Sequence, residues 1–187
     1  MTEKEKRYLG LPHHLFKDPS IFEEMAEIKD LCFKYNQVIP SNKEARNEIL
    51  EEILQNKTEN VNIWSPFQCF HGKNIRLGKN FFANHNLIVI DMCEVVIGDN
   101  VMFGPNVTIV TANHPKSPKE REENLEFGAK VVIENNVWLA AGVTVCPGVT
   151  IGENSIIGAG SVVTKSIPKN VVAYGVPCKV IEKIEGK

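Results

Sequence analysis

The sequence lacks a strong charge of either sign, a long apolar run and a closely spaced pair of cysteines. Its 21 lysines and arginines nearly balance its 23 aspartates and glutamates, so the formal net charge of −2 offers no basic field for a nucleic acid. The richest apolar stretch, residues 137–152, is interrupted by glycine and proline and does not predict a transmembrane helix. We expect neither nucleic acid nor a membrane among the partners.

The cysteines are too few and too scattered to organise the fold. Five are present, an odd number, and they form no Cys-x-x-Cys pair, which argues against a disulfide framework or a metal clip. The first ten residues, MTEKEKRYLG, carry mixed charges and no apolar stretch follows, so they do not resemble a secretory signal. These features predict a cytoplasmic protein with reduced, mostly packed thiols at Cys32, Cys69, Cys93, Cys146 and Cys178.

The N-terminal part of the chain is predicted to be helical. The 187 residues are 43% apolar and 24% charged, which is typical of one domain with at most a small cap. From Asp18 to about residue 57 apolar residues recur at helical spacing, with Asp18 as N-cap and Pro19 as the first helical residue. Residues 41–44, SNKE, match a capping box and predict a second, antiparallel helix.

Beyond Ile75 the period changes to six residues. Twelve hexads can be marked between residues 77 and 168, and the first position of every one is apolar. In nine of them the fourth position is asparagine or glycine, the residue types that best tolerate a left-handed backbone. The first positions are Leu77, Ala83, Val89, Ile97, Phe103, Ile109, Ile133, Leu139, Val145, Ile151, Ile157 and Val163.

Short strands separated by regular corners favour a solenoid. Isolated hexads cannot bury their apolar residues, but stacked coils make a continuous apolar column and pair their backbones from coil to coil. We predict an all-β solenoid, a parallel β-helix with about three hexads per triangular coil and about four coils. An ordinary β-sandwich, with hairpin turns every 8–12 residues, is contradicted by the period.

The repeat is interrupted once at length, by an insertion that begins with His114-Pro115. The charged run KSPKEREENLEFG follows before the period resumes at Ile133 in the same phase. Loops that protrude from a rigid scaffold often carry function, and His114 lies where this one leaves the coils. By position alone, His114 is either a functional histidine or simply an exposed or structurally bonded one.

Several segments together resemble the hexapeptide-repeat O-acetyltransferases of the galactoside and maltose type. They are NIRLGKNFFANHNLIVID, IGDNVMFGPNVTIVTANHP, NNVWLAAGVTVCPGVTIG, IGAGSVVTK and YGVPCKVI. The resemblance implies a left-handed β-helix, a homotrimer, and acetyl transfer from acetyl-CoA to a sugar at sites between subunits, without a metal. It divides the chain into a helical cap at 1–60, a β-helix at 61–170 with an inserted loop at 111–130, and an extension at 171–187.

The resemblance also implies a catalytic role for His114, which matches the family's TxxHP histidine. An imidazole is suited to take the proton of a sugar hydroxyl as this attacks the thioester, and then to protonate the leaving thiolate. A covalent route needs an activated serine or cysteine beside a base. No cysteine is close in sequence, and Ser117 lies within the loop, so we expect direct attack.

Four residues are implied to contact the acceptor sugar. Asn84 matches the family's acceptor-binding asparagine, and Asp18 roughly matches an aspartate near the N-terminus. Glu126, in LEFG, matches a position that orients either His114 or the acceptor, and Asp91 precedes a position where relatives carry an acid. The alternatives are ordinary ones: Asn84 bonds its own backbone at a corner, and Glu126 is a solvated loop carboxylate.

The coenzyme is implied to lie in a groove lined by six matched positions. The two alanines among them would act through their backbones, and the lysines suit phosphates, although any surface lysine has the same chemistry. The tryptophan has core packing as an equally weighted alternative. These positions are Trp138, Ala141, Ala159, Thr164, Lys165 and Lys179.

Three departures from the family bear on specificity. Phe70 and Met92 replace polar or acidic residues that contact the acceptor, and Glu182 replaces a basic residue near the coenzyme. Galactoside or maltose specificity is therefore less secure than acetyl transfer itself. Two other functions stay open: a non-catalytic trimeric scaffold, and a zinc carbonic anhydrase, although Lys119 stands where a second histidine ligand is needed.

Overall fold

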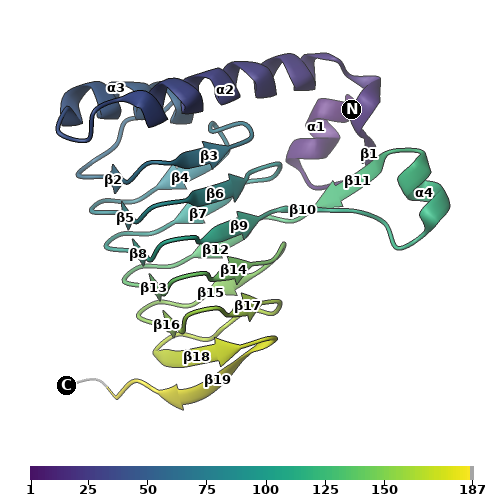
Figure 1. Ribbon diagram of the computed structural model, residues 1–187. Coiled ribbons are helices and arrows are strands. Elements are labelled where there is room, and N and C mark those ends of the chain that lie inside the picture. The colour runs from purple at the N-terminus through teal and green to yellow at the C-terminus, as the bar shows by residue number, and fades with distance from the viewer. Residues whose placement is uncertain (186–187) are drawn as a thin grey trace.

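The computed structural model, which describes residues 1–185, is a parallel β-solenoid beneath an N-terminal helical cap (Figure 1). The predicted fold class is confirmed, and the coils wind in the left-handed sense from the cap toward the C-terminus. The helices are α1 (Glu3–Tyr8), α2 (Ser20–Gln37), α3 (Lys43–Leu54) and α4 (Pro118–Glu122), with a 3-10 turn at Leu15–Lys17.

Three parallel sheets form the faces of the prism. The first face contains β2 (Asn62–Ile63), β5 (Phe82–Ala83), β8 (Met102–Phe103), β13 (Trp138–Leu139), β16 (Ile156–Ile157) and β18 (Val171–Gly175), with β19 (Cys178–Lys183) antiparallel at its end. The second contains β3 (Phe67–Cys69), β6 (Leu87–Ile90), β9 (Thr108–Val110), β14 (Thr144–Val145) and β17 (Val162–Val163). The third contains β4 (Ile75–Leu77), β7 (Val95–Ile97), β12 (Val131–Ile133) and β15 (Thr150–Ile151).

The first positions of the hexads build the core. The register places Ala83, Phe103, Leu139 and Ile157 in one inward column on the first face, and eleven of the twelve first positions are buried while Leu77 is half-buried. The solenoid is longer than the predicted four coils, because six parallel strands succeed one another on the first face within residues 1–185. Coils before Leu77 and after Val163 account for the difference.

The corners confirm the role assigned to asparagine and glycine. All nine fourth positions have positive φ, from 56° at Asn100 to 81° at Gly148. The asparagines at one corner also form a hydrogen-bonded column that the sequence did not predict. Each side-chain Nδ2 donates to the Oδ1 of the asparagine one coil further along. This ladder runs through Asn60, Asn80, Asn100, Asn136, Asn154 and Asn170.

The helix starts differ from their predictions by one residue. α2 begins at Ser20 rather than Pro19, although Asp18 still provides the capping interaction, since its Oδ1 accepts from Ser20 N at 3.2 Å. The predicted capping box at residues 41–44 is wrong. Asn42 caps α3 by accepting from Ala45 N at 3.2 Å, since asparagine caps a helix as well as serine does.

The insertion folds back against the N-terminal segment. β10 (Ala112–Asn113) and β11 (Leu125–Gly128) form an antiparallel pair, and β1 (His13–His14) adds to the other edge of β11. In Figure 1 this small sheet projects sideways from the upper coils, next to α1. The short helices α1 and α4 show no apolar periodicity and were not predicted.

Across residues 1–185, no helix is both long and apolar enough to cross a membrane. All five cysteines are free thiols, four of them buried and Cys146 half-buried.

Candidate active site

The small sheet brings a cluster of charged side chains together around Glu126. The carboxylate lies on β11, directly opposite His13 in the β1 register. Its Oε2 is 3.2 Å from Arg7 Nη1 and 3.5 Å from His13 Nε2, and its Oε1 is 3.8 Å from His114 Nε2. Segments more than 100 residues apart in sequence therefore meet at one carboxylate.

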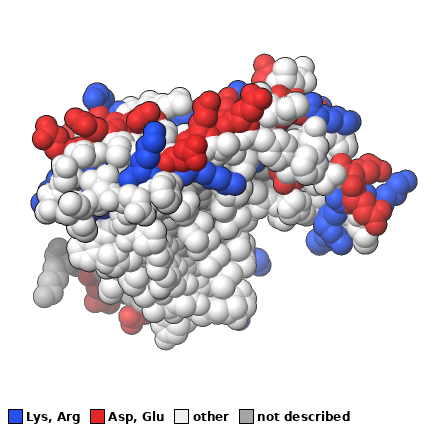
Figure 2. Space-filling model, turned by 45° about the horizontal axis from the view of Figure 1, so that its top comes forward, with Lys and Arg blue, Asp and Glu red and all other residues white. Residues whose placement is uncertain are grey.

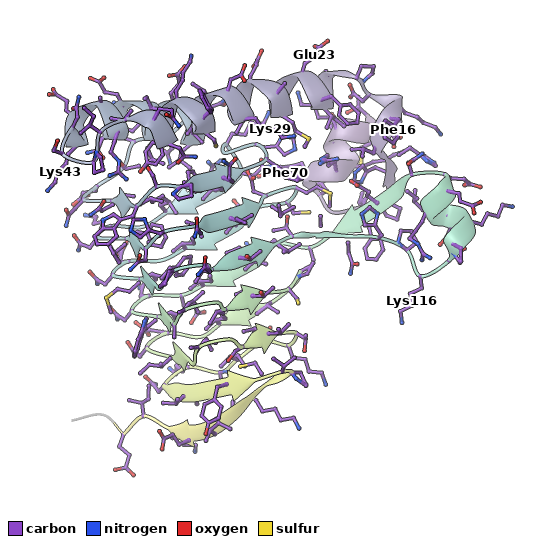
Figure 3. All side chains as sticks on the ribbon, in the orientation of Figure 1. Phe16, Glu23, Lys29, Lys43, Phe70 and Lys116 are labelled. Atoms are coloured by element: carbon purple, nitrogen blue, oxygen red, sulfur yellow. The ribbon has the colours of Figure 1, made fainter. Side chains whose placement is uncertain are left out.

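Exposure differs sharply within this cluster. Arg7 and His13 are buried, and the Glu126 side chain is 12% exposed, whereas that of His114 is 59% exposed. The histidine is therefore the member that a ligand can reach from solvent. Lys116, two residues further on, points away from the loop in Figure 3 and takes no part in the cluster.

The surroundings of Glu126 keep it ionised. Burial by itself raises the pKa of this carboxyl, but a hydrogen bond from His13 and the charges of Arg7 and His114 outweigh burial, so the pKa lies below its usual value. A carboxylate fixed beside an imidazole orients the ring and favours its protonated form. The arrangement suits a histidine that must accept a proton during a reaction.

Arg7 and His13 are the residues that sequence reasoning missed. Arg7 lies in a charged segment and His13 in a His-His pair, and neither stands out by spacing. Their position depends on β1 pairing with a strand of the loop, for which no local pattern exists.

The comparisons with known proteins agree with the fold. The maltose acetyltransferase hexapeptide capping motif matches residues 8–58, and the bacterial transferase hexapeptide (six repeats) matches residues 130–165. A galactoside O-acetyltransferase of Lactococcus lactis is 48% identical over 168 residues, which cover 89% of this chain and 81% of the relative. The chain belongs to the hexapeptide-repeat O-acetyltransferases of the galactoside and maltose type.

Solved structures of this family superpose closely. A maltose O-acetyltransferase from Clostridium difficile 630 has a TM-score of 0.96 at 44% identity, covering 100% of this chain and 99% of the other. A galactoside acetyltransferase in complex with coenzyme A has a TM-score of 0.89 at 38% identity, covering 99% and 92%.

The residues that the resemblance implies for acceptor binding do not all belong to the Glu126 cluster. Glu126 contacts His114, as described above. Asp18 is half-buried and bonded to Ser20, whose Oγ donates to Asp18 Oδ1 at 2.6 Å. Among the hydrogen bonds and ion pairs of residues 1–185, none connects Asp18 with the Glu126 cluster.

Asp91, which the resemblance places near the acceptor, lies inside the solenoid. Asp91 is fully buried, and its Oδ1 accepts from the backbone N of Phe70 at 2.8 Å and of His71 at 3.0 Å. Burial raises its pKa to about 6, although these backbone hydrogen bonds oppose the shift. Its Oδ1 thus closes a corner of the solenoid, whereas its Oδ2 has no hydrogen-bond partner among the described residues, and a contact with the acceptor stays a prediction.

Asn84 and His114 lie at different corners of one chain. Asn84 follows β5, where the first face turns into the second, and its Oδ1 accepts from His85 N at 2.7 Å. His114 belongs to the insertion that follows the second face at β9. One subunit therefore does not bring these two residues together.

The implied coenzyme positions are all exposed at the surface. Ala141 and Ala159 occupy the corner between the first and second faces on successive coils, where Gly160 N donates to Ala141 O at 2.8 Å. Thr164 and Lys165 follow β17 at the next corner, and Lys179 lies on β19. The coenzyme positions therefore lie at more than one corner of the prism, as Asn84 and His114 do.

Trp138 is 44% exposed on the first face, which rules out core packing as its role. Its register neighbours are Met102 on one coil and Ile156 on the next. Of the departures from the family, Met92 is buried, Phe70 is half-buried and Glu182 is exposed on β19. Within the described residues 1–185, no three His, Cys, Asp or Glu side chains are grouped to hold a metal ion.

Proposed function

We propose that this chain transfers an acetyl group from acetyl-CoA to a hydroxyl of a sugar of the galactoside or maltose type, with His114 as the general base. The observation that carries the proposal is the exposed His114 imidazole, 3.8 Å from a buried carboxylate whose pKa is lowered. Membership of a family that includes galactoside and maltose O-acetyltransferases supplies the reaction class.

The proposed reaction is a direct displacement in a ternary complex. The His114 imidazole takes the hydroxyl proton as the sugar oxygen bonds to the thioester carbonyl carbon, giving a tetrahedral intermediate and an imidazolium. The intermediate collapses by breaking the carbon–sulfur bond, and the imidazolium returns the proton to the leaving thiolate. Glu126 is ionised throughout and stabilises the imidazolium between these two steps.

The active site is proposed to form between subunits of a homotrimer. Asn84 and His114 sit at different corners of a triangular prism, and a cyclic trimer places one corner of each subunit against another corner of its neighbour. Figure 2 shows that charged residues gather over the helices and the loop, whereas the visible face of the coils is largely uncharged. Exposed apolar side chains at Ile88, Met102 and Trp138 suit such an interface.

The coenzyme is proposed to lie along the same subunit boundary. Backbone groups at Ala141 and Ala159 border its pantetheine arm, and Lys165 and Lys179 offer point charges to its phosphates. Thr164 and Trp138 complete the groove. We also propose a cytoplasmic location, which would give the protein access to acetyl-CoA. A galactoside acetyltransferase solved with coenzyme A has this fold, which supports the assignment.

Replacing His114 by alanine tests the proposal. Loss of the base should lower kcat by roughly two to four orders of magnitude while the Kd of acetyl-CoA barely changes, because the coenzyme groove is intact. Thiol release measures the first quantity and titration calorimetry the second. Lys119→Ala, an exposed change on α4 in the same loop, serves as the control and should match the wild type. Equal turnover in both variants would place the base elsewhere, whereas absence of thiol release by the wild type would favour the non-catalytic scaffold.

A further inference from the structure

A cavity of about 940 Å³ lies beside the catalytic cluster, between α1, the start of α2 and the strand β4. Lys4 and Arg7 of α1 line it from one side, and His71, Lys73 and Arg76 from the other. The mechanism proposed above uses none of this space, which is large enough for a monosaccharide and a substituent.

Two residues connect the cavity with the reaction. Arg7 lines the cavity and also bonds to Glu126, whose other oxygen faces His114. Met92 lines it too, and Met92 stands at a family position that contacts the acceptor. A molecule in the cavity is therefore one side chain away from the carboxylate that orients the base.

The charged residues of the lining carry a net positive charge. Four lysines and arginines face two glutamates, and Glu24 is already shared by Lys4 and by Lys73, the latter at 2.9 Å. Arg76 Nη1 donates only to the carbonyl of Lys73, at 2.8 Å, and Arg76 has no ion-pair partner among the described residues 1–185. One cation at the cavity is thus without a counter-charge.

Buried polar atoms at the cavity are also unsatisfied. His71 is 5% exposed, and neither its Nε2 nor the Nε of Arg7 has a hydrogen-bond partner in the described chain. Burial is the main cause that lowers the pKa of His71 to about 4, and the charges of Arg7 and Lys73 add to it. An uncharged His71 still offers a hydrogen bond to an anion.

We propose that this cavity binds an anionic substituent of the acceptor, a phosphate or a carboxylate, and that Arg76 determines this specificity. The inference rests on the proposed acetyl transfer and narrows its substrate class. It also explains why Phe70 and Met92 can stand where relatives carry polar residues. An ion pair with a charged substituent provides binding energy that these apolar side chains cannot obtain from neutral sugar hydroxyls.

Three matched acceptors test the inference: galactose, galactose 6-phosphate and galacturonate, each with saturating acetyl-CoA. At least one anionic sugar should show a KM about fivefold or more below that of galactose, and the two anionic arms distinguish phosphate from carboxylate. Arg76→Gln should raise the KM of the preferred anionic sugar by about fivefold and so reduce its preference over galactose. Arg76→Lys should keep most of this preference. Lys79→Gln is the control, since Lys79 is exposed, pairs with Glu59 at 3.1 Å and lies outside the cavity.

The outcomes separate the two proposals. Equal KM values for all three sugars, or an unchanged preference in Arg76→Gln, would overturn the anionic site while leaving acetyl transfer intact. If no sugar releases thiol, the reaction assignment fails for these acceptors, and titration calorimetry then decides the site by itself. Binding of galactose 6-phosphate or galacturonate that weakens in Arg76→Gln but not in Lys79→Gln supports the cavity, and absence of binding to the wild type refutes it.

Discussion

Replacing Glu126 by glutamine removes the charge beside His114 and keeps the side-chain volume. The carboxylate Oε1 lies 3.8 Å from the imidazole Nε2, and two unit charges at about 4 Å attract by about 4 kcal/mol at an effective dielectric constant of about 20. Water screens part of this attraction because the His114 side chain is 59% exposed. We expect a loss of about 2 kcal/mol in transition-state stabilisation, which is about thirtyfold in kcat.

The assay is the steady-state release of coenzyme A thiol between about pH 5 and 8. The loss should appear in kcat, because the carboxylate favours an imidazolium that exists only during the reaction. Glu126→Asp retains the charge and should recover part of the activity.

Stability must be followed in parallel, because Arg7 is buried and loses its counter-charge in Glu126→Gln. A lower melting temperature is therefore expected for this variant, and kinetics are measured well below it. A folded Glu126→Gln protein with the kcat of the wild type would refute the coupling between Glu126 and His114.

Three further predictions follow from the interface, the cavity and the corners. Trp138→Glu places a charge on the proposed interface and should convert a trimer into monomers by light scattering; a wild-type mass near 20.9 kDa would rule out the trimer itself. The pKa of His71 falls from 6.5 to about 4 on folding, so the wild type loses stability as pH drops through this window. The free energy of unfolding of His71→Asn, measured relative to wild type in urea titrations, should therefore rise by about 3 kcal/mol between pH 7 and 4. A difference between the two proteins that stays constant with pH would contradict the burial of His71 as a neutral group. Asn100 has φ 56° and sits in the asparagine ladder, so Asn100→Ala should lower the free energy of unfolding by about 1–3 kcal/mol and Asn100→Gly by less, since glycine tolerates this φ; equal losses would assign the effect to the ladder alone.

The sequence by itself determined the solenoid and its corners. A six-residue period in apolar residues is a local property. Each hexad has the same inward-facing position and the same left-handed corner, so an error in predicting one hexad does not affect the prediction of the next. Positive φ at Asn80 or Gly142 follows from residue type. The insertion after Ile109 was visible because it breaks this period and then restores its phase.

Only the tertiary structure decided what surrounds His114. Arg7 and His13 reach Glu126 because β1 pairs with β11 across more than 100 residues, and such docking depends on the shape of both partners rather than on a local pattern. The same reason explains the burial of Asp91, whose Oδ1 accepts hydrogen bonds from backbone amides of the preceding coil. Residue types indicate which chemistry is available, but burial and long-range pairing determine which side chains are free to perform it.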